Sequence, residues 1–362
     1  MVAAGGDTVG SHTVLLSSEG AAVACGRNAQ GQCDVPALEG GLVYTQAAAG
    51  ACHTVLLRSD GSAVACGCNR KGQCEIPALM DGLVYTQVAA GGHHSVLLRS
   101  DGSAVACGDN PAGQCDIPAL QGGLFYTQVA VGWLHTVLLR SDGSVVSCGS
   151  NHDGQCEFPK LAERLAYTQV AAGNCHTVLL RSDGSAVACG ENYYGQCELP
   201  AVKALGGLTY TQVAAGWTHT VMLMSDGSAV ACGSNLHGQR EIPVLAEGMI
   251  YTSIAAGRCH TTLLRSDGTA VACGTNAGRE CSFPALGDGL TYVTPSPPTL
   301  LLQASFDGAS VRFLALGGEE RCRVGAAPGT PLADVRDRLA AERTAARLGP
   351  GLARVDAALP GG

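Results

Sequence analysis

Residues 85–108 read YTQVAAGGHHSVLLRSDGSAVACG, and this stretch recurs along most of the chain with few changes. Each copy has a histidine before an apolar run, then Ser-Asp-Gly or a close variant, then a short run that ends in Cys-Gly. Successive marker histidines are 41, 41, 41, 41, 43 and 41 residues apart. A fixed period of this length indicates a tandem-repeat architecture. The seven histidines are His12, His53, His94, His135, His176, His219 and His260.

Each repeat contains three clear strand signals. Residues 88–91 are small and suit an innermost strand, where neighbouring sheets converge, while residues 95–98 are mostly apolar. Asp101-Gly102 predicts a two-residue hairpin turn, because this pair tolerates the positive φ that such turns require. Residues 103–107 then return as the third strand.

A short fourth strand is expected around Cys115, ending at Pro118, which has no N–H and suits an outer edge. Four-stranded sheets repeated radially make a β-propeller. Helical repeats are the competing interpretation, but the Asp-Gly turns and the lack of a 3.6-residue periodicity count against them. We therefore predict an all-β, seven-bladed β-propeller of about 41-residue repeats over residues 1–294. Either residues 2–5 or residues 292–294 would complete the first blade.

The repeat resembles that of the regulator-of-chromosome-condensation family. The resemblance rests on residues 132–136 (Gly-Trp-Leu-His-Thr), residues 107–110 (Cys-Gly-Asp-Asn) and Gly113-Gln114, and it recurs seven times. It implies a seven-bladed propeller. Members of the family act as exchange factors for small GTPases, as chromatin binders, as photoreceptors and as modules of ubiquitin ligases. This chain departs from the family in its shorter repeats, in the Cys after Gly-Gln, and in its seventh copy, where residues 278–281 read Gly-Arg-Glu-Cys.

The C-terminal part departs from the repeat pattern. Residues 295–308 begin with Pro-Ser-Pro-Pro and are predicted to be a linker, although Asp307-Gly308 matches the repeat turn and leaves an eroded eighth repeat as the alternative. Residues 309–362 form a small α+β segment in this prediction, with strands at 310–316 and 321–326 and a helix from Thr330 to about Arg347. Thr330 suits an N-cap and the proline after it suits the first helical turn. This order resembles the first half of a ubiquitin-like domain.

Composition excludes several classes of function. The net charge is −8 and the pI is about 5.6, so a general affinity for nucleic-acid phosphate is not expected. No signal peptide follows Met1, and no apolar run is long enough to span a membrane. We therefore expect a cytoplasmic or nuclear protein without membrane contact, and no sequence motif indicates a cofactor.

The repeated polar residues are interpreted as structural. His94, Ser100 and Asp101 have the residue types of a catalytic triad, but the set recurs around every hairpin, so we expect the histidine to serve packing or a backbone hydrogen bond. Cys-His pairs lie in separate blades, which argues against zinc. Cysteine pairs such as Cys107 and Cys115 could form a disulfide in each blade, but the sixth repeat has Arg240 at the partner position. We therefore expect buried free thiols that act as small apolar residues.

Two positions vary between copies of an otherwise constant unit. One is the pair of residues before each marker histidine, and the other is the loop around the repeat Asn. Because successive strands run in opposite directions, both positions are predicted to lie on one face of the propeller, with the Ser-Asp-Gly turns on the other. Loops on a rigid scaffold are frequent binding sites, and Trp is enriched at binding hot spots. The candidate partner-binding residues are Arg70, Lys71, His93, Trp133, Leu134, Tyr193, Tyr194, Trp217 and Arg258.

These features predict a protein-binding scaffold rather than an enzyme, in line with a module of a ubiquitin-ligase-related protein. No ligase catalytic domain is recognised in this chain. The first alternative is a guanine-nucleotide exchange factor for a small GTPase. Exchange requires a projecting element that opens the nucleotide site, and the only internal insertion recognised is two residues near 204–205. The second alternative is a chromatin-binding protein whose acidic residues meet histones.

Overall fold

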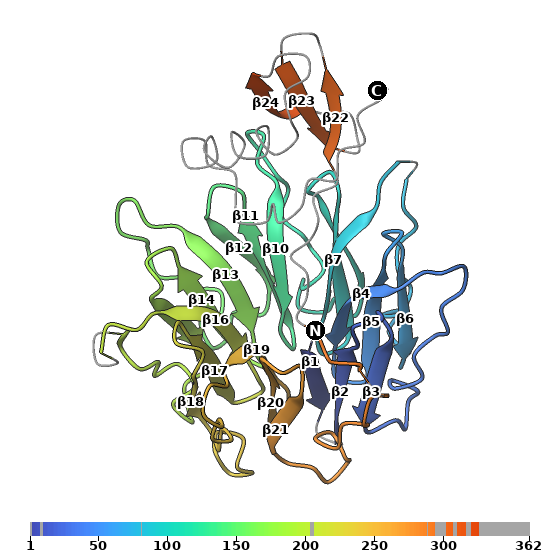
Figure 1. Ribbon diagram of the computed structural model, residues 1–362. Helices are drawn as coiled ribbons and strands as arrows, with labels where there is room; N and C mark the ends of the chain where they lie inside the picture. The colour runs from blue at the N-terminus through green and yellow to red at the C-terminus, as the bar shows by residue number, and fades with distance from the viewer. Residues whose placement is uncertain are drawn as a thin grey trace.

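The computed structural model describes residues 2–7, 10–80, 82–202, 206–287 and 289–293, together with the backbone of residues 302–306, 310–315 and 320–325. In the first five of these ranges the strands form seven three-stranded antiparallel sheets. The sheets are arranged around a central axis, and the chain passes from each sheet to the next around the ring (Figure 1). The predicted all-β propeller with seven repeating blades is confirmed.

Each blade consists of an inner, a middle and an outer strand. The inner strands are β1 (Val2–Asp7), β4 (Tyr44–Ala49), β7 (Tyr85–Ala90), β10 (Tyr126–Val131), β13 (Tyr167–Ala172), β16 (Tyr210–Ala215) and β19 (Tyr251–Ala256). The middle strands are β2 (Gly10–Leu16), β5 (His53–Arg58), β8 (His94–Arg99), β11 (His135–Arg140), β14 (His176–Arg181), β17 (His219–Met224) and β20 (His260–Arg265). The outer strands are β3 (Ala22–Gly26), β6 (Ala63–Gly67), β9 (Ala104–Gly108), β12 (Val145–Gly149), β15 (Ala186–Gly190), β18 (Ala229–Gly233) and β21 (Ala270–Gly274).

The core lies between successive blades rather than within one of them. Side chains of a strand point alternately to its two faces. In β8, Val96 therefore packs toward the next blade, where Leu138 is fully buried. Its neighbour Leu97 packs toward the preceding blade and contacts the cluster that contains Val55. Each middle strand thus connects two interfaces, which explains why it is apolar at consecutive positions.

The predicted fourth strand of each blade is absent from the part of the chain that the structure describes. In the third repeat the residues after β9 form turns instead. The Asn110 side chain accepts a hydrogen bond from the Cys115 backbone N–H at 2.7 Å, and the Tyr126 hydroxyl donates to the Pro118 carbonyl at 2.5 Å. These side-chain bonds satisfy backbone groups that a strand would have paired in a ladder, so the fourth-strand prediction was wrong.

The first blade is completed from both ends of the ring. Strand β1 pairs with β2 from Val2 opposite Leu15, as one prediction proposed. Tyr292 also pairs with Ser17, and the Val293 N–H donates to the Leu16 carbonyl at 3.0 Å. In the six other blades a tyrosine occupies the corresponding place at the start of the inner strand. The two predicted closures therefore act together.

The seven marker histidines form a closed ring of contacts between blades. Each is fully buried, and each Nε2 lies 2.9–3.1 Å from a Thr or Ser hydroxyl of the following blade, with His260 returning to Thr13. The expected role was packing or a backbone hydrogen bond: the rings are packed in the core, but their partner is a side-chain hydroxyl and not a backbone group. The hydroxyl belongs to the residue that follows the marker histidine in the next copy, so the motif joins neighbouring blades.

The hydrogen bond that the hydroxyl donates determines which nitrogen of the imidazole carries the proton. Thr136 Oγ1 donates its hydrogen to the Gln114 carbonyl at 2.7 Å, and a hydroxyl has only one hydrogen to donate. His94 Nε2, at 3.0 Å from the same oxygen, must therefore be the donor. Its Nδ1 is then unprotonated, and among the described residues it has no hydrogen-bond partner. Burial without a second partner disfavours the charged form and lowers the pKa of His94 to about 3.

The described cysteines are free thiols, as predicted. In the third repeat, Cys107 Sγ donates to the carbonyl of Gln73 in the second repeat at 3.6 Å, and Cys115 Sγ donates to the Asp109 carbonyl of its own repeat at 3.4 Å. Most of these thiols are half-buried rather than fully buried, and the buried ones are Cys52, Cys232 and Cys259. The prediction of wholly buried side chains therefore holds only for a minority.

Native thiols are expected to react slowly with disulfide reagents at pH 8. Burial raises the pKa of Cys107 from 9.0 to about 12, and only the thiolate is nucleophilic. The thiolate fraction falls by about 1,000-fold for such a shift. A stopped-flow titration with a chromogenic disulfide, run on native and on denatured protein, measures this difference. Similar rates in the two states would contradict the assignment.

The C-terminal residues form a sheet of their own, with β22 (Leu302–Phe306), β23 (Ser310–Ala315) and β24 (Glu320–Gly325) in that order. Strands β23 and β24 lie where the two strands of this segment were predicted. The linker prediction for 295–308 was wrong over residues 302–306, which pair with β23. The predicted helix from Thr330 lies outside the described residues, and nothing supports the ubiquitin-like resemblance.

Candidate protein-binding face

The two predicted faces of the propeller are present. The name variable face is used for the surface that two sets of loops form. These are the connections between inner and middle strands, such as residues 50–52, and the turns after the outer strands, such as residues 68–73. The Cys68 N–H donates to the Cys52 carbonyl at 2.8 Å, which places these two loops together. We call constant face the surface of the Ser-Asp-Gly turns. There, Asp60 Oδ1 accepts hydrogen bonds from the N–H and the hydroxyl of Ser62.

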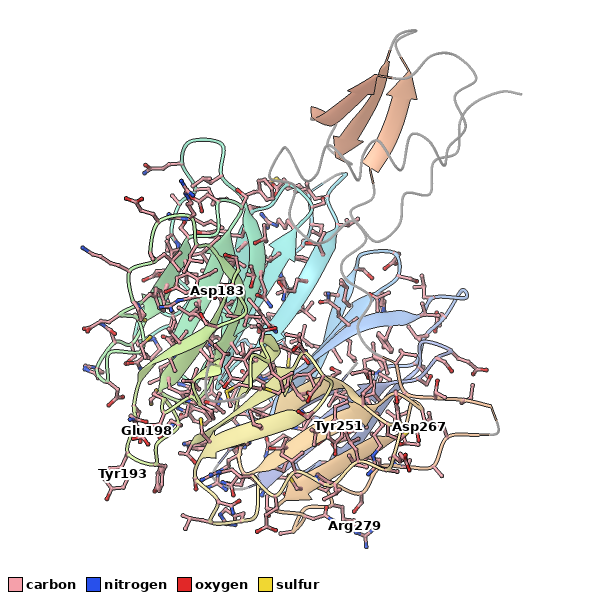
Figure 2. All side chains as sticks on the ribbon, turned by 60° about the vertical axis from the view of Figure 1, so that its left-hand side comes forward. Asp183, Tyr193, Glu198, Tyr251, Asp267 and Arg279 are labelled. Atoms are coloured by element: carbon pink, nitrogen blue, oxygen red, sulfur yellow. The ribbon has the colours of Figure 1, made fainter. Side chains whose placement is uncertain are left out.

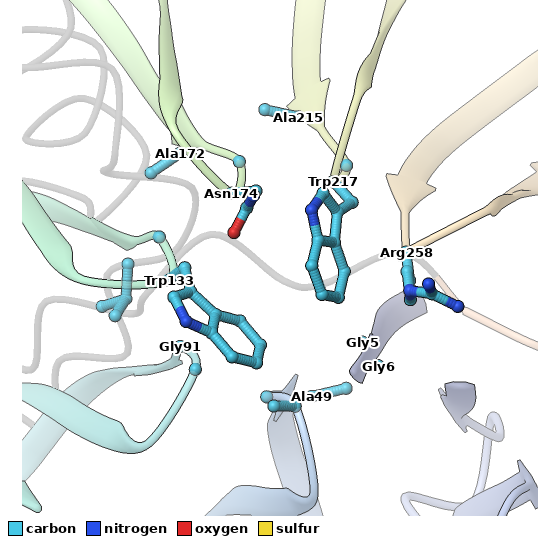
Figure 3. A pocket seen from close by; sticks show the side chains of 18 of the residues that line it. Gly5, Gly6, Ala49, Gly91, Trp133, Ala172, Asn174, Ala215, Trp217 and Arg258 are labelled. Atoms are coloured by element: carbon cyan, nitrogen blue, oxygen red, sulfur yellow. The ribbon is translucent and has the colours of Figure 1, made fainter. Parts of the chain in front are cut away.

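Four of the candidate residues form a continuous stack across the axis of the variable face. The ring centroids of His93 and Trp133 are 5.3 Å apart at 65°, and those of Trp133 and Trp217 are 5.1 Å apart at 33°. The guanidinium carbon of Arg258 lies 4.8 Å from the centroid of Trp217. Figure 3 shows the two indoles meeting between the inner strands, with Arg258 beyond Trp217. The stack joins the third, fourth, sixth and seventh repeats.

A small cavity of about 80 Å³ lies at the axis, and Trp133, Trp217 and Arg258 of the stack line it. Asn174 and Val131 also line it, and its other lining residues are Ala and Gly of the inner strands and the loops that follow them. Asn174 was not among the predicted site residues. It precedes its marker histidine by two residues, as Trp133 and Trp217 do in their own repeats, so the repeat register alone would have identified it. In the described part of the chain, no group of His, Cys, Asp and Glu side chains is arranged to bind a metal ion.

The remaining predicted residues are not members of the stack. Tyr193 and Tyr194 form an edge-to-face pair with centroids 5.2 Å apart, and their exposed fractions are 85% and 43%. Figure 2 shows Tyr193 at the periphery, projecting outward. Lys71 forms an ion pair with Asp109 at 3.3 Å. Arg70 is exposed and Leu134 is half-buried. Four of the candidate residues thus form the stack, and Tyr193 and Tyr194 form a separate pair.

The first repeat has an element on this face that sequence reasoning missed. The β1–β2 ladder continues past the marker histidine, pairing Gly6 with Ser11 and Asp7 with Gly10. In the second repeat the corresponding ladder ends at Ala49 opposite Thr54. The expectation that the only internal insertion lies near 204–205 was therefore wrong. The longer spacing between the inner-strand Gly5 and His12 is the sequence signal that would have shown it.

Carboxylates are concentrated on another part of this face. Glu191 lies close to Asp153 of the preceding repeat, and burial together with the neighbouring carboxylate raises the pKa of Glu191. At the equivalent place between the second and third repeats, Lys71 faces Asp109 instead. The electrostatic character of the variable face therefore changes around the ring.

The comparison with known families agrees with the repeat geometry. The model of the regulator of chromosome condensation (RCC1) repeat matches residues 44–73, 85–114, 126–155, 167–196 and 210–239. The chain belongs to the RCC1 repeat family. Each matched segment of this RCC1-repeat protein runs from the tyrosine that begins an inner strand to the Gln after the outer strand.

Solved structures share the propeller fold at low sequence identity. Human WBSCR16 is 19% identical with a TM-score of 0.62, covering 72% of this chain and 85% of its own. The ectodomain of the Arabidopsis thaliana receptor kinase ACR4 is 19% identical with a TM-score of 0.61, covering 78% and 97%. Saccharomyces cerevisiae Prp20p, described with its binding to Gsp1p and histones, is 19% identical with a TM-score of 0.57, covering 83% and 86%. No curated protein sequence matches the chain.

Proposed function

We propose that this propeller is a protein-binding module whose partner docks on the variable face, with the His93–Trp133–Trp217–Arg258 stack at the centre of the interface. The stack is the observation that carries the proposal. Half-buried Trp and Arg side chains are the residues most enriched among binding hot spots, and here they are gathered over a cavity at the axis.

The contrast between the two faces supports this assignment. On the constant face the Asp side chain of the turn is occupied by local hydrogen bonds in six repeats, for example Asp101 with Ser103. On the variable face the repeats differ at the positions that point toward solvent. Binding specificity requires differences between repeats, and these differences are confined to loops held by a rigid scaffold.

Replacing both stacked indoles is expected to abolish partner binding without unfolding the protein. Trp133→Ala and Trp217→Ala introduce the residue that the second repeat has at Ala51, so each blade can accommodate the change. Truncating a hot-spot Trp typically costs about 2–4 kcal/mol of binding free energy. The measurement is affinity capture with quantitative mass spectrometry, followed by titration of the recovered partner.

Phe125→Ala is the matched control. Phe125 lies against the constant turn at Gly102, and the fourth repeat has Ala166 at the equivalent place against Gly143. The control removes an aromatic side chain from the opposite face by a change that the fold already contains. If the double Trp variant and the Phe125 variant recover the same partners as the native chain, the variable face is not the binding site.

Nucleotide exchange on a small GTPase is the second candidate, and the extended β1–β2 hairpin is the observation that favours it. Exchange needs an element that projects from the propeller, and this hairpin continues three residue pairs beyond the corresponding ladder of the second blade. Shortening the hairpin by residues 7–10 is expected to abolish any acceleration of nucleotide release. If the native chain does not accelerate release of a fluorescent nucleotide from a panel of small GTPases, this candidate is rejected.

A further inference from the structure

Positively charged side chains of the variable face are gathered on one side of the ring. In the loops of the third, fourth and fifth repeats there is no Lys or Arg, and the charged groups there include Asp109, Asp153 and Glu191. The sixth, seventh, first and second repeats are consecutive around the closed ring, because Thr13 of the first blade contacts His260 of the seventh. Their loops contain Arg240, Arg258, Arg279, Arg27, Arg70 and Lys71.

The seventh repeat also lacks an acidic residue that the others share. In the third repeat, Asn110 Nδ2 donates to Asp116 Oδ1 at 2.9 Å, and a carboxylate follows the same turn in each of the first six repeats. In the seventh, Asn276 Nδ2 donates to the Ser282 hydroxyl at 3.1 Å. Glu280 stands where the other six repeats have Gln, but it is buried and its carboxylate accepts a hydrogen bond from the Gly278 N–H at 2.8 Å. The exposed part of this turn therefore presents Arg279 without an exposed carboxylate beside it.

Four of these cations, Arg70, Arg240, Arg258 and Arg279, form no ion pair with a carboxylate in the described part of the chain. Lys71 is paired with Asp109, and Arg240 donates to the Gly233 carbonyl at 2.9 Å. Arg70, Arg258 and Arg279 form no ion pair there, and Arg258 Nε is buried without an acceptor. Arg258 is nevertheless held in place, because its guanidinium lies over Trp217. A guanidinium fixed in this way can bind a carboxylate with little loss of side-chain freedom.

Arg279 has a backbone conformation that only glycine has at the equivalent position of the six other repeats. Its φ is 69°, and the six other repeats have Gly31, Gly72, Gly113, Gly154, Gly195 and Gly238 there, with φ of 77–80°. A residue with a Cβ is strained in this region. The exposed Arg279 projects from the lower edge in Figure 2.

We propose that the arginine side of the variable face, formed by the sixth, seventh, first and second repeats, binds an acidic peptide segment of the protein partner. This inference rests on the proposed function and names the chemistry of the partner. Carboxylates of the segment bind Arg258 at the axis and Arg279 toward the edge. A peptide fits better than a nucleic acid, because the net charge of −8 and the carboxylates of the third to fifth repeats repel a long polyanion.

The test uses the full chain and a fluorescein-labelled oligoglutamate peptide, with oligoglutamine as the neutral probe and oligothymidylate as the nucleic-acid probe. Fluorescence anisotropy at low salt is expected to show binding of oligoglutamate alone, weakening as salt is added. Arg258→Asn, which introduces the residue of the fifth repeat, is expected to weaken binding about 10-fold. Arg279→Gly is expected to weaken it about 3-fold.

Arg164→Gly is the matched control for Arg279→Gly. Arg164 also has φ of 69°, is exposed, and occupies a place where the third repeat has Gly123, but it lies in the segment that leads to the constant face. Both glycine variants remove one positive charge and relieve the same backbone strain, so both are expected to raise the melting temperature. Only Arg279→Gly is expected to weaken binding of oligoglutamate.

Equal weakening by Arg164→Gly and Arg279→Gly would overturn the proposal, since the effect would then follow net charge alone. Failure of the native chain to prefer oligoglutamate over oligoglutamine would also overturn it, as would tighter binding of oligothymidylate with the same dependence on arginine. The capture experiment with the two Trp variants is independent of these probes. If it still shows partner loss, the proposed function stands and only the acidic chemistry of the partner is rejected.

Discussion

Acidification from pH 7 to pH 5 is expected to lower the free energy of unfolding by on the order of 10 kcal/mol. Burial lowers the pKa of each of the seven ring histidines to about 3 or 4, from an ordinary value of 6.5. The unfolded chain therefore binds protons below pH 6.5 that the folded chain excludes. The stabilisation that comes from the neutral histidines is therefore fully present above pH 6.5. It decreases as the pH falls, until the pH reaches the pKa values of these histidines in the folded state.

The loss is comparable to the whole stability of an ordinary domain, so cooperative unfolding is expected within this window. The measurement is urea denaturation at a series of pH values. Near pH 5.5 the slope of unfolding free energy against pH should correspond to about six protons. His176→Gln keeps an amide donor for the Thr220 hydroxyl, and it should reduce that slope by about one proton. A native slope below about three protons would contradict the assignment of neutral, buried imidazoles.

Gly132→Ala is expected to destabilise the propeller by roughly 3 to 5 kcal/mol. A methyl group at Gly132 would overlap the ring of His135 and crowd the carbonyl oxygen of Gly173 in the next blade. Relief requires movement of the imidazole, which breaks its contact with the Thr177 hydroxyl. Thermal or urea unfolding of the purified variant measures the change.

Gly287→Ala is the control for this substitution. Its added methyl group would meet only Leu290 Cδ1 at 3.9 Å, and its backbone is not among the positive-φ glycines. A change of this kind reduces the freedom of the unfolded chain and is expected to stabilise by about 0.5 kcal/mol. If the two variants have the same stability, the close approach of Gly132 to the histidine ring is not what restricts this position.

The blades could be predicted from the sequence because their determinants are local. The period, the Asp-Gly turn and the apolar run at residues 95–98 each act within a few residues. The fourth strand could not be excluded in this way, because the Asn110 side chain competes with a ladder for the Cys115 N–H. Strand propensity carries no information about that competition.

The contacts between blades were harder to predict than the blades themselves. The sequence shows a histidine and a hydroxyl in every copy, but not that His94 Nε2 contacts Thr136, which lies 42 residues further along the chain. The same holds for the candidate site. Because successive strands run in opposite directions, the sequence predicted that Trp133 and Trp217 lie on the same face. Their contact was not predictable, because they belong to the fourth and sixth repeats and meet across the axis, beside Asn174 of the fifth.

The shared first blade also determines when the protein can finish folding during its synthesis. Within the propeller, strands β1 to β3 are synthesised before the other blades, whereas their partner Tyr292 is synthesised after the seventh blade. At ordinary translation rates of about 5–20 residues per second, roughly 15 to 60 seconds separate the two events. Throughout that interval the first blade has one interface without its neighbour. The nascent chain can add blades in order, but the joint between the first blade and Tyr292 forms only after nearly the whole repeat array has left the ribosome.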